Sequence, residues 1–198
     1  MLFYAICAGV LAPSFIGTTI FFHQVYLTEI RGWPLSLFAI GFVVLSVTTM
    51  AVSLLAGYLI DRFSAVSLIP IFLVPLALAS FAAAFLTDPS AIFVFMALLG
   101  VCYGFSSTLE AALWPEIYGT EHLGSVRSVV LAAMVFASAI GPGLTGYLID
   151  AGVAYPKQLA AMGVYCVVAA SIMLLTSRKL VLRSSIQLAV PVDDASKR

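Results

Sequence analysis

Hydrophobic residues along this chain gather into six long stretches, and nearly every charged residue lies between them. The stretches cover residues 2–28, 36–60, 67–86, 90–113, 123–149 and 158–177. A helix needs about 20 residues to cross a hydrocarbon core about 30 Å thick, because it rises about 1.5 Å per residue. Transmembrane strands are only about 9–11 residues long and alternate in polarity. The pattern therefore predicts an all-α membrane protein with six transmembrane helices.

Composition supports this prediction. Hydrophobic residues make up 63% of the chain and charged residues 9%, and the mean hydropathy is +1.14, which lies outside the range of water-soluble domains. The loops are short, so we expect one transmembrane bundle over 1–177 and a solvated, disordered cytoplasmic tail over 178–198. The first stretch has no positively charged segment before it, so it does not look like a cleaved signal. The formal net charge of zero gives no basic face for nucleic acid.

The basic residues predict the orientation, because short loops rich in Lys and Arg stay on the cytoplasmic side. With six spans, only Arg31 and Lys157 lie on one side of the membrane. The other side carries Arg62, Arg127, Arg178, Lys179, Arg183, Lys197 and Arg198. We expect a multi-pass protein of the plasma (inner) membrane with both termini in the cytoplasm.

A five-residue repeat relates the two halves of the chain. Residues 57–61, Gly-Tyr-Leu-Ile-Asp, recur letter for letter at 146–150. The two copies close the second and fifth stretches, which are equivalent if the chain is two three-helix units. An odd number of spans per unit inverts the second unit, as in secondary transporters. The alternative is a chance match in an apolar chain of few residue types.

The first copy continues into Arg62, and Gly57-x-x-x-Asp61-Arg62 resembles the loop signature of the major facilitator superfamily. In that family the signature lies between the second and third helices of each six-helix half. A small residue lets helices approach, and an acid beside a base at a helix end can form a breakable charge cluster. The usual further glycine and basic run are missing from 63–66. The signature is thus more like the C-terminal half of the family than the N-terminal half.

Three other segments resemble parts of the same family. Residues 141–146, Gly-Pro-Gly-Leu-Thr-Gly, are similar to a motif of its drug/proton antiporters, with Thr145 in place of one glycine. Pro142 there either kinks the span for gating or makes an ordinary packing kink. Residues 113–127, which include Glu116, resemble the inner loop between the fourth and fifth helices. Residues 21–33 resemble the monocarboxylate and oxalate/formate branch, but the cation that this branch commonly places in its eighth or eleventh helix is missing here.

Two ionisable side chains stand out inside the stretches, where such groups are functional candidates. For Glu110, near the inner surface, we expect a charge pair with Arg62 or Arg127, or else an interfacial carboxylate. For His23, near the outer surface, the alternatives are outer-gate hydrogen bonding or proton sensing, and a solvated or packed histidine. The residues expected to act in gating are Gly57, Asp61, Arg62, Glu110, Glu116, Arg127, Gly141, Pro142 and Gly146.

Polar residues near the middle of the spans are the candidates for solute contact. They are Ser14, Thr18, Ser46, Thr49, Tyr103, Ser106, Ser107 and Ser138, with His23 toward the outer side. On the fourth stretch Tyr103, Ser107, Glu110 and Trp114 recur at helical spacing, which predicts a polar and aromatic stripe along a cavity. Gly100-x-x-x-Gly104 predicts a close approach of a neighbouring helix.

Motifs for other chemistry do not occur in the sequence. It contains no His-Glu-x-x-His, no Gly-x-Ser-x-Gly, no phosphate-binding glycine loop with lysine and no metal-ligand cluster. Cys7, Cys102 and Cys166 all lie inside stretches, and we interpret them as small buried hydrophobes. We therefore expect neither an enzyme nor a cofactor nor a metal site.

The resemblance implies half of a major facilitator transporter, which moves a small solute by alternating access, with a proton as the coupling ion. A twelve-helix carrier would need a second six-helix half, or a second copy of this chain as a homodimer partner. The alternative is a transport-incompetent remnant, or an accessory subunit that associates with another carrier. No nucleic acid partner is expected.

Overall fold

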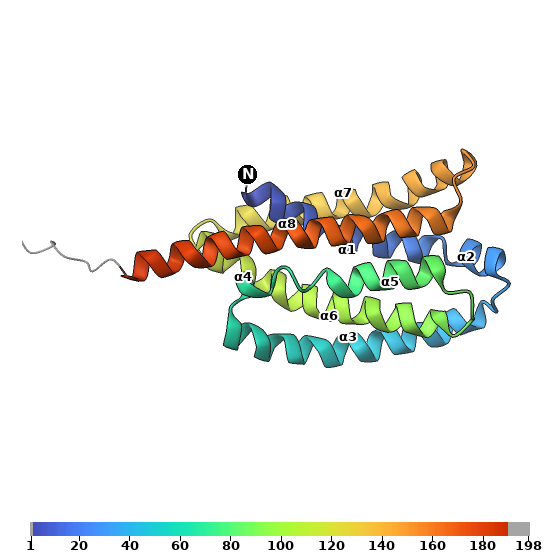
Figure 1. Ribbon diagram of the computed structural model, residues 1–198, viewed down its shortest axis with the longest axis horizontal. Helices are drawn as coiled ribbons and strands as arrows, with labels where there is room; N and C mark the ends of the chain where they lie inside the picture. Colours follow the sequence, from blue (N-terminus) through green and yellow to red (C-terminus); the bar gives the residue numbers. More distant parts are fainter. Residues whose placement is uncertain (1, 190–198) are drawn as a thin grey trace, which may run out of the picture.

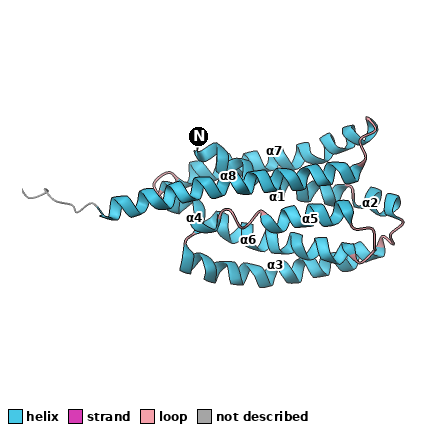
Figure 2. Ribbon diagram, viewed as in Figure 1, coloured by secondary structure: helices cyan, strands magenta, loops and turns pink. Residues whose placement is uncertain are grey.

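Eight helices make up residues 2–189, the part of the chain that the computed structural model describes (Figure 1). They are α1 (Leu2–Phe22), α2 (Gln24–Arg31), α3 (Ser36–Phe63), α4 (Ala65–Leu68), α5 (Val74–Phe85), α6 (Ala91–Tyr118), α7 (Leu123–Asp150) and α8 (Tyr155–Ala189). No strand occurs between residues 2 and 189 (Figure 2). The all-α prediction is confirmed for this part of the chain.

The number of spans differs from the predicted six. Within residues 2–189, α3, α6, α7 and α8 are each long and apolar enough to cross a membrane, and α1 with α2 makes a fifth if that bent pair is one span. The stretch predicted at 67–86 is divided into the short helices α4 and α5. Pro70 lies in the break. Proline has no N–H to donate to the carbonyl one turn back, so the helix is interrupted there.

The first stretch is also broken, at His23. The axes of the helices before and after this residue differ by 58°. His23 has φ −98° and ψ 18°, outside helical geometry, and its Nδ1 lies 3.1 Å from the carbonyl oxygen of Thr19. α2 then ends at Gly32, whose φ of 66° is the left-handed conformation that favours glycine at a helix C-terminus.

The long helices pack side by side along one axis (Figure 1). α3 packs against α6, α6 against α1, and α1 against α7. α5 and α8 pack against each other, and they also cover α6 and α1 respectively. We call α3, α6, α1 and α7 the four-helix row. Among the long apolar helices α6 is the most buried and α3 and α7 are the least buried, so the row is open at both of its edges.

α3 and α6 approach each other closely because two glycines of α6 lie between them. A Cβ added to Gly100 would lie 2.7 Å from the carbonyl oxygen of Leu45. One added to Gly104 would overlap the α3 backbone at Thr49. Real Cβ atoms essentially never come within 3.0 Å of another heavy atom. The close helix approach predicted from Gly100-x-x-x-Gly104 is confirmed, with α3 as the neighbour.

α8 is longer than the predicted span. It continues beyond residue 177 to Ala189, so the first part of the segment predicted as a disordered tail is helical. Residues 190–198, the rest of that segment, lie outside the described residues.

Candidate functional site

Three aromatic side chains connect α1, α3 and α6. The ring centroid of Phe21 lies 5.3 Å from that of Phe42 and 6.3 Å from that of Tyr103. Tyr103 also lies directly over Gly17, where an added Cβ would overlap its hydroxyl. These contacts place Phe21, Phe42 and Tyr103 at one level of the four-helix row, and we call them the aromatic cluster.

Three predicted hydroxyl residues lie one turn from the aromatic cluster. Thr18 lies three positions before Phe21 on α1. Ser46 lies four positions after Phe42 on α3, and Ser107 lies four positions after Tyr103 on α6. Residues three or four apart lie on the same helix face. α1 runs opposite to α3 and α6 (Figure 1), so these steps lead toward the same end of the bundle. One turn further toward that end lie Ser14, Thr49 and Glu110.

This face of the row is open. Ser46 and Ser107 are exposed, and Ser14, Thr18, Thr49 and Glu110 are half-buried. The hydroxyls donate to carbonyls one turn back on their own helices: Thr18 to Ser14 and Phe15, Ser46 to Phe42, Thr49 to Leu45, Ser107 to Gly104, and Ser138 to Val135. A hydroxyl that donates in this way keeps its oxygen as an acceptor for another group.

The stripe expected on α6 is only partly open. Trp114 is buried against Phe3 of α1, with ring centroids 6.0 Å apart, and stacks on Tyr118. Tyr103 is held in the aromatic cluster. Ser107 and Glu110, between these two aromatic residues, stay accessible. Ser106 is not a lining residue, because it is buried with its hydroxyl 3.7 Å from the Cys102 sulfur.

The segment that resembles the family signature lies where α3 ends. Asp61 and Arg62 are both exposed. Arg62 Nη1 donates to the hydroxyl of Tyr58 at 3.2 Å, and its guanidinium carbon lies 5.5 Å from the Phe63 ring centroid. A Cβ added to Gly57 would meet no atom within 4 Å, so no described helix packs against this glycine.

The charge pair expected between Glu110 and Arg62 or Arg127, or else an interfacial carboxylate, stays a prediction. Among the described side chains, no acidic oxygen lies within 4.0 Å of a basic nitrogen. At Arg62, the guanidinium contacts Tyr58 and Phe63 of its own helix. Arg127 is exposed at the start of α7.

Glu116 makes a contact that sequence reasoning missed. Its Oε2 accepts a hydrogen bond of 2.8 Å from the backbone N–H of Ala65, the first residue of α4. Ser64, just before it, has φ 68°, which is uncommon for a residue with a side chain. An N–H in the first turn of a helix has no intrahelical partner, so a carboxylate is a favourable acceptor. The carboxylate thus connects the end of α6 to the turn after Asp61 and Arg62.

The bend at His23 lies against α7 and α8. The rings of His23 and Tyr155 are 5.5 Å apart, and a Cβ added to Gly146 would lie 3.8 Å from His23 Nε2. Gly141 lies closer still to α1, because an added Cβ would be 2.6 Å from the hydroxyl oxygen of Thr19. Pro142 lies inside α7, which remains one helix. His23 is therefore packed at a junction of three helices.

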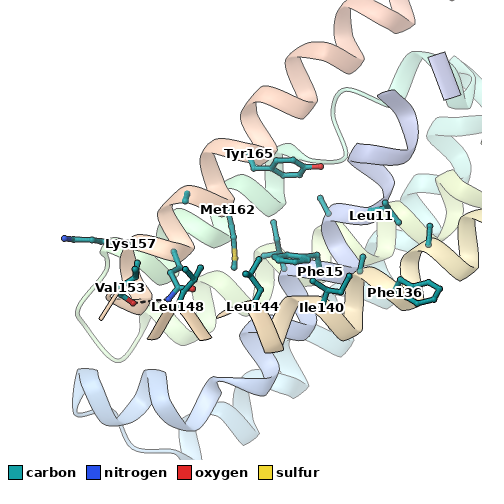
Figure 3. Close-up of a pocket in the computed structure, with 16 residues that line it drawn as sticks. Leu11, Phe15, Phe136, Ile140, Leu144, Leu148, Val153, Lys157, Met162 and Tyr165 are labelled. Carbon is teal, nitrogen blue, oxygen red and sulfur yellow. Dashed lines mark hydrogen bonds between the residues drawn. The ribbon is translucent and has the colours of Figure 1, made fainter. Parts of the chain in front are cut away.

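A cavity among the described residues lies elsewhere. It measures about 900 Å³ and is bounded by α1, α7 and α8 (Figure 3). None of the predicted solute-contact residues lines it. The cavity exists because α7 and α8 lie apart. The distance between two helices cannot be predicted from a sequence pattern, so sequence reasoning missed this cavity. Within residues 2–189, no group of three or more His, Cys, Asp or Glu side chains could hold a metal ion.

Several long apolar helices, most of them with exposed hydrophobic side chains, define an integral multi-pass membrane protein. The family model of the Major Facilitator Superfamily matches residues 4–189, nearly the whole chain, and the chain belongs to this superfamily. Members of this superfamily are transporters, not enzymes, and membership implies a transporter embedded in the lipid bilayer. No curated protein matches the sequence.

Proposed function

We propose that the chain is one six-helix half of a twelve-helix secondary transporter, and that it moves a small solute by alternating access. The observation that carries the proposal is the open face of the four-helix row. There, Thr18, Ser46 and Ser107 come from three helices to one level beside the aromatic cluster. Polar groups facing outward from an apolar bundle are costly in lipid, so we infer that a solute cavity covers them.

Six crossings are part of this proposal. We infer that α1 with α2 forms the first crossing, and that α4 with α5 forms a broken third crossing. Discontinuous helices are common in secondary transporters. We place both termini on the cytoplasmic side of the plasma (inner) membrane, because Arg31 and Lys157 are the basic residues at the opposite end.

The helix contacts support an inverted repeat. In this repeat α1 with α2 corresponds to α6, α3 corresponds to α7, and α4 with α5 corresponds to α8. Each main contact between helices then has a counterpart. Packing of α3 on α6 corresponds to packing of α7 on α1. Packing of α5 on α6 corresponds to packing of α8 on α1, and the contact between α5 and α8 corresponds to itself. We infer that the repeated pentapeptide reflects this relation.

A second bundle completes the proposed carrier. One half supplies one wall of a central cavity, and the row of α3, α6, α1 and α7 is the wall that this chain offers. The partner is a separate six-helix half or a second copy of the chain. The coupling ion in this proposal is a proton, carried by Glu110, which is half-buried one turn from Ser107.

The test is counterflow uptake in liposomes with a panel of small organic acids, sugars, amino acids and drugs. Thr18→Val and Ser107→Ala should each reduce uptake of the transported solute about fivefold, the effect of one net hydrogen bond of about 1 kcal/mol. Ser46→Ala should act in the same way, and Ser171→Ala is its matched control. Both serine hydroxyls donate at 2.8 Å to a carbonyl of their own helix, but Ser171 lies on α8.

Equal uptake by the Ser46 and Ser171 variants would contradict the proposed wall. If folded chain shows no uptake, the panel is repeated after adding candidate six-helix partners. Continued absence of transport would then favour the accessory or transport-incompetent alternative.

A further inference from the structure

α7 and α8 separate on the side of the bundle away from α3, and they leave a long apolar trough. Beyond their connecting turn they make few contacts with each other. The trough is the cavity of about 900 Å³ shown in Figure 3. Side chains of α1 such as Leu11 and Phe15 form its floor, and side chains such as Ile140 of α7 and Met162 of α8 form its walls.

The trough has the length of one lipid chain. Its lining residues on α7 run from Ala133 to Leu148, which at about 1.5 Å per residue is about 22 Å. One leaflet of the hydrocarbon core is about 15 Å deep, half of the total of about 30 Å. An extended acyl chain that starts at the membrane surface therefore fits along the trough.

One end of the trough is polar, and it carries an unused hydrogen-bond acceptor. Gln158 is only 5% exposed. Its Nε2 donates to the carbonyl oxygen of Val153 at 3.0 Å, the bond drawn dashed in Figure 3. That bond identifies the other amide atom as Oε1, which is buried and has no partner. A buried acceptor without a donor is unfavourable, so a ligand that brings a donor here is stabilised.

A basic side chain lies at the same end. Lys157, the next residue along, lines the trough with its stem, and its ammonium extends away from the apolar side chains (Figure 3). The turn from α7 to α8 ends two apolar helices, so this ammonium lies at the level of lipid headgroups. The trough thus combines an apolar channel, a buried acceptor and a cation at the membrane surface.

We propose that this trough binds one acyl chain of a glycerophospholipid whose headgroup carries both an anionic phosphate and a hydrogen-bond donor. The phosphate pairs with Lys157, and a headgroup hydroxyl donates to Gln158 Oε1. A small polar solute does not fit the apolar walls. A neighbouring transmembrane helix uses its backbone N–H groups internally and has none for Gln158.

The test is native mass spectrometry of the full chain in a neutral detergent, titrated with two phospholipids of the same acyl chains. Phosphatidylglycerol offers hydroxyl donors and a net negative charge, and phosphatidylcholine offers neither. We expect the chain to prefer phosphatidylglycerol about fivefold for the hydrogen bond and about fivefold more for the charge beside Lys157. Gln158→Leu should remove the first factor and leave phosphatidylcholine binding unchanged, and Lys157→Gln should remove the second factor.

Two matched substitutions test the location. Ala161→Phe places a ring in the trough and should abolish retention of both lipids. Ala139→Phe adds the same ring to an exposed position of α7 that does not line the trough, and should leave retention unchanged. Monodisperse elution and an unchanged helical circular dichroism spectrum confirm that each variant is folded.

Three results would overturn the proposal: equal retention of the two lipids by the unaltered chain, equal loss in the two phenylalanine variants, or displacement of phosphatidylglycerol by a transported solute. The assay contains no transport step. A failure here therefore leaves the proposed transport function standing, and a failure of transport leaves this site standing.

Discussion

Replacing Gly100 by alanine should destabilise the bundle, although alanine is the better helix former. An added Cβ would lie 2.7 Å from the carbonyl oxygen of Leu45, whereas ordinary van der Waals contact begins at 3.4 Å. α3 and α6 would have to move apart by the difference, about 0.7 Å, or distort locally. Overpacking of this kind costs about 1–3 kcal/mol. It outweighs the gain of about 0.5–1 kcal/mol from replacing a helical glycine.

Gly143→Ala is the matched control. Gly143 lies inside α7, and an added Cβ there would meet no atom within 4 Å. The substitution should leave stability unchanged, or raise it by up to about 1 kcal/mol from helix propensity alone. The assay is thermal unfolding of purified chain in one detergent, followed by the buried tryptophan fluorescence of Trp114 and Trp33.

The comparison refutes the reasoning if the two alanine variants unfold at the same temperature. That result would mean that the backbones of α3 and α6 are not in contact. The positions of the aromatic cluster and of Thr18, Ser46 and Ser107 relative to one another would then be wrong. A lower unfolding temperature for Gly100→Ala alone supports the close approach.

Three further substitutions test separate contacts. Glu116→Gln removes the negative charge that accepts a hydrogen bond from the first N–H of α4. It should increase the rate at which a cysteine reagent labels a cysteine introduced at that end of the bundle. The control is Glu121→Gln, which neutralises an exposed carboxylate and should leave the labelling rate unchanged. Glu110→Gln should abolish uptake driven by a pH gradient and leave counterflow exchange intact, and loss of both would contradict its proton-carrying role. Tyr165→Phe removes a 2.7 Å hydrogen bond to a backbone carbonyl of α1 and should lower stability by about 1 kcal/mol, whereas Tyr147→Phe, at a 70% exposed side chain, should have no effect on the same unfolding curve.

The apolar pattern was sufficient to predict helices, and it located α3, α6 and α7 to within a few residues. It failed where helices break. The break in the third stretch had a signal in Pro70, whose missing N–H interrupts the helix. The bend at His23 had none, because neither glycine nor proline lies there and the geometry depends on packing against Tyr155 and the α7 backbone near Gly146.

For the candidate site, too, spacing along the chain predicts some features and not others. Counting residues along each span predicts that Thr18, Ser46 and Ser107 lie near the middle of their spans, because helix rise is regular. The charge pair expected for Glu110 stays a prediction, but the contacts of Arg62 with a nearby tyrosine and phenylalanine were not predicted. Competition between partners for one guanidinium depends on side-chain positions, which spacing alone does not report.

The lipid trough and the proposed transport cycle meet at α7. Helices that move in a transport cycle are drawn from those with little buried surface, and α7 is among the least buried of the long helices. Gly141 holds it close to α1, but toward α8 it faces the trough and not another helix. We therefore expect a lipid in the trough to restrict α7. Backbone amides of residues 133–148 should exchange hydrogen more slowly in phosphatidylglycerol than in phosphatidylcholine, while those of α6 should not change. Equal exchange of α7 in the two lipids would mean that contact with α1 alone positions this helix.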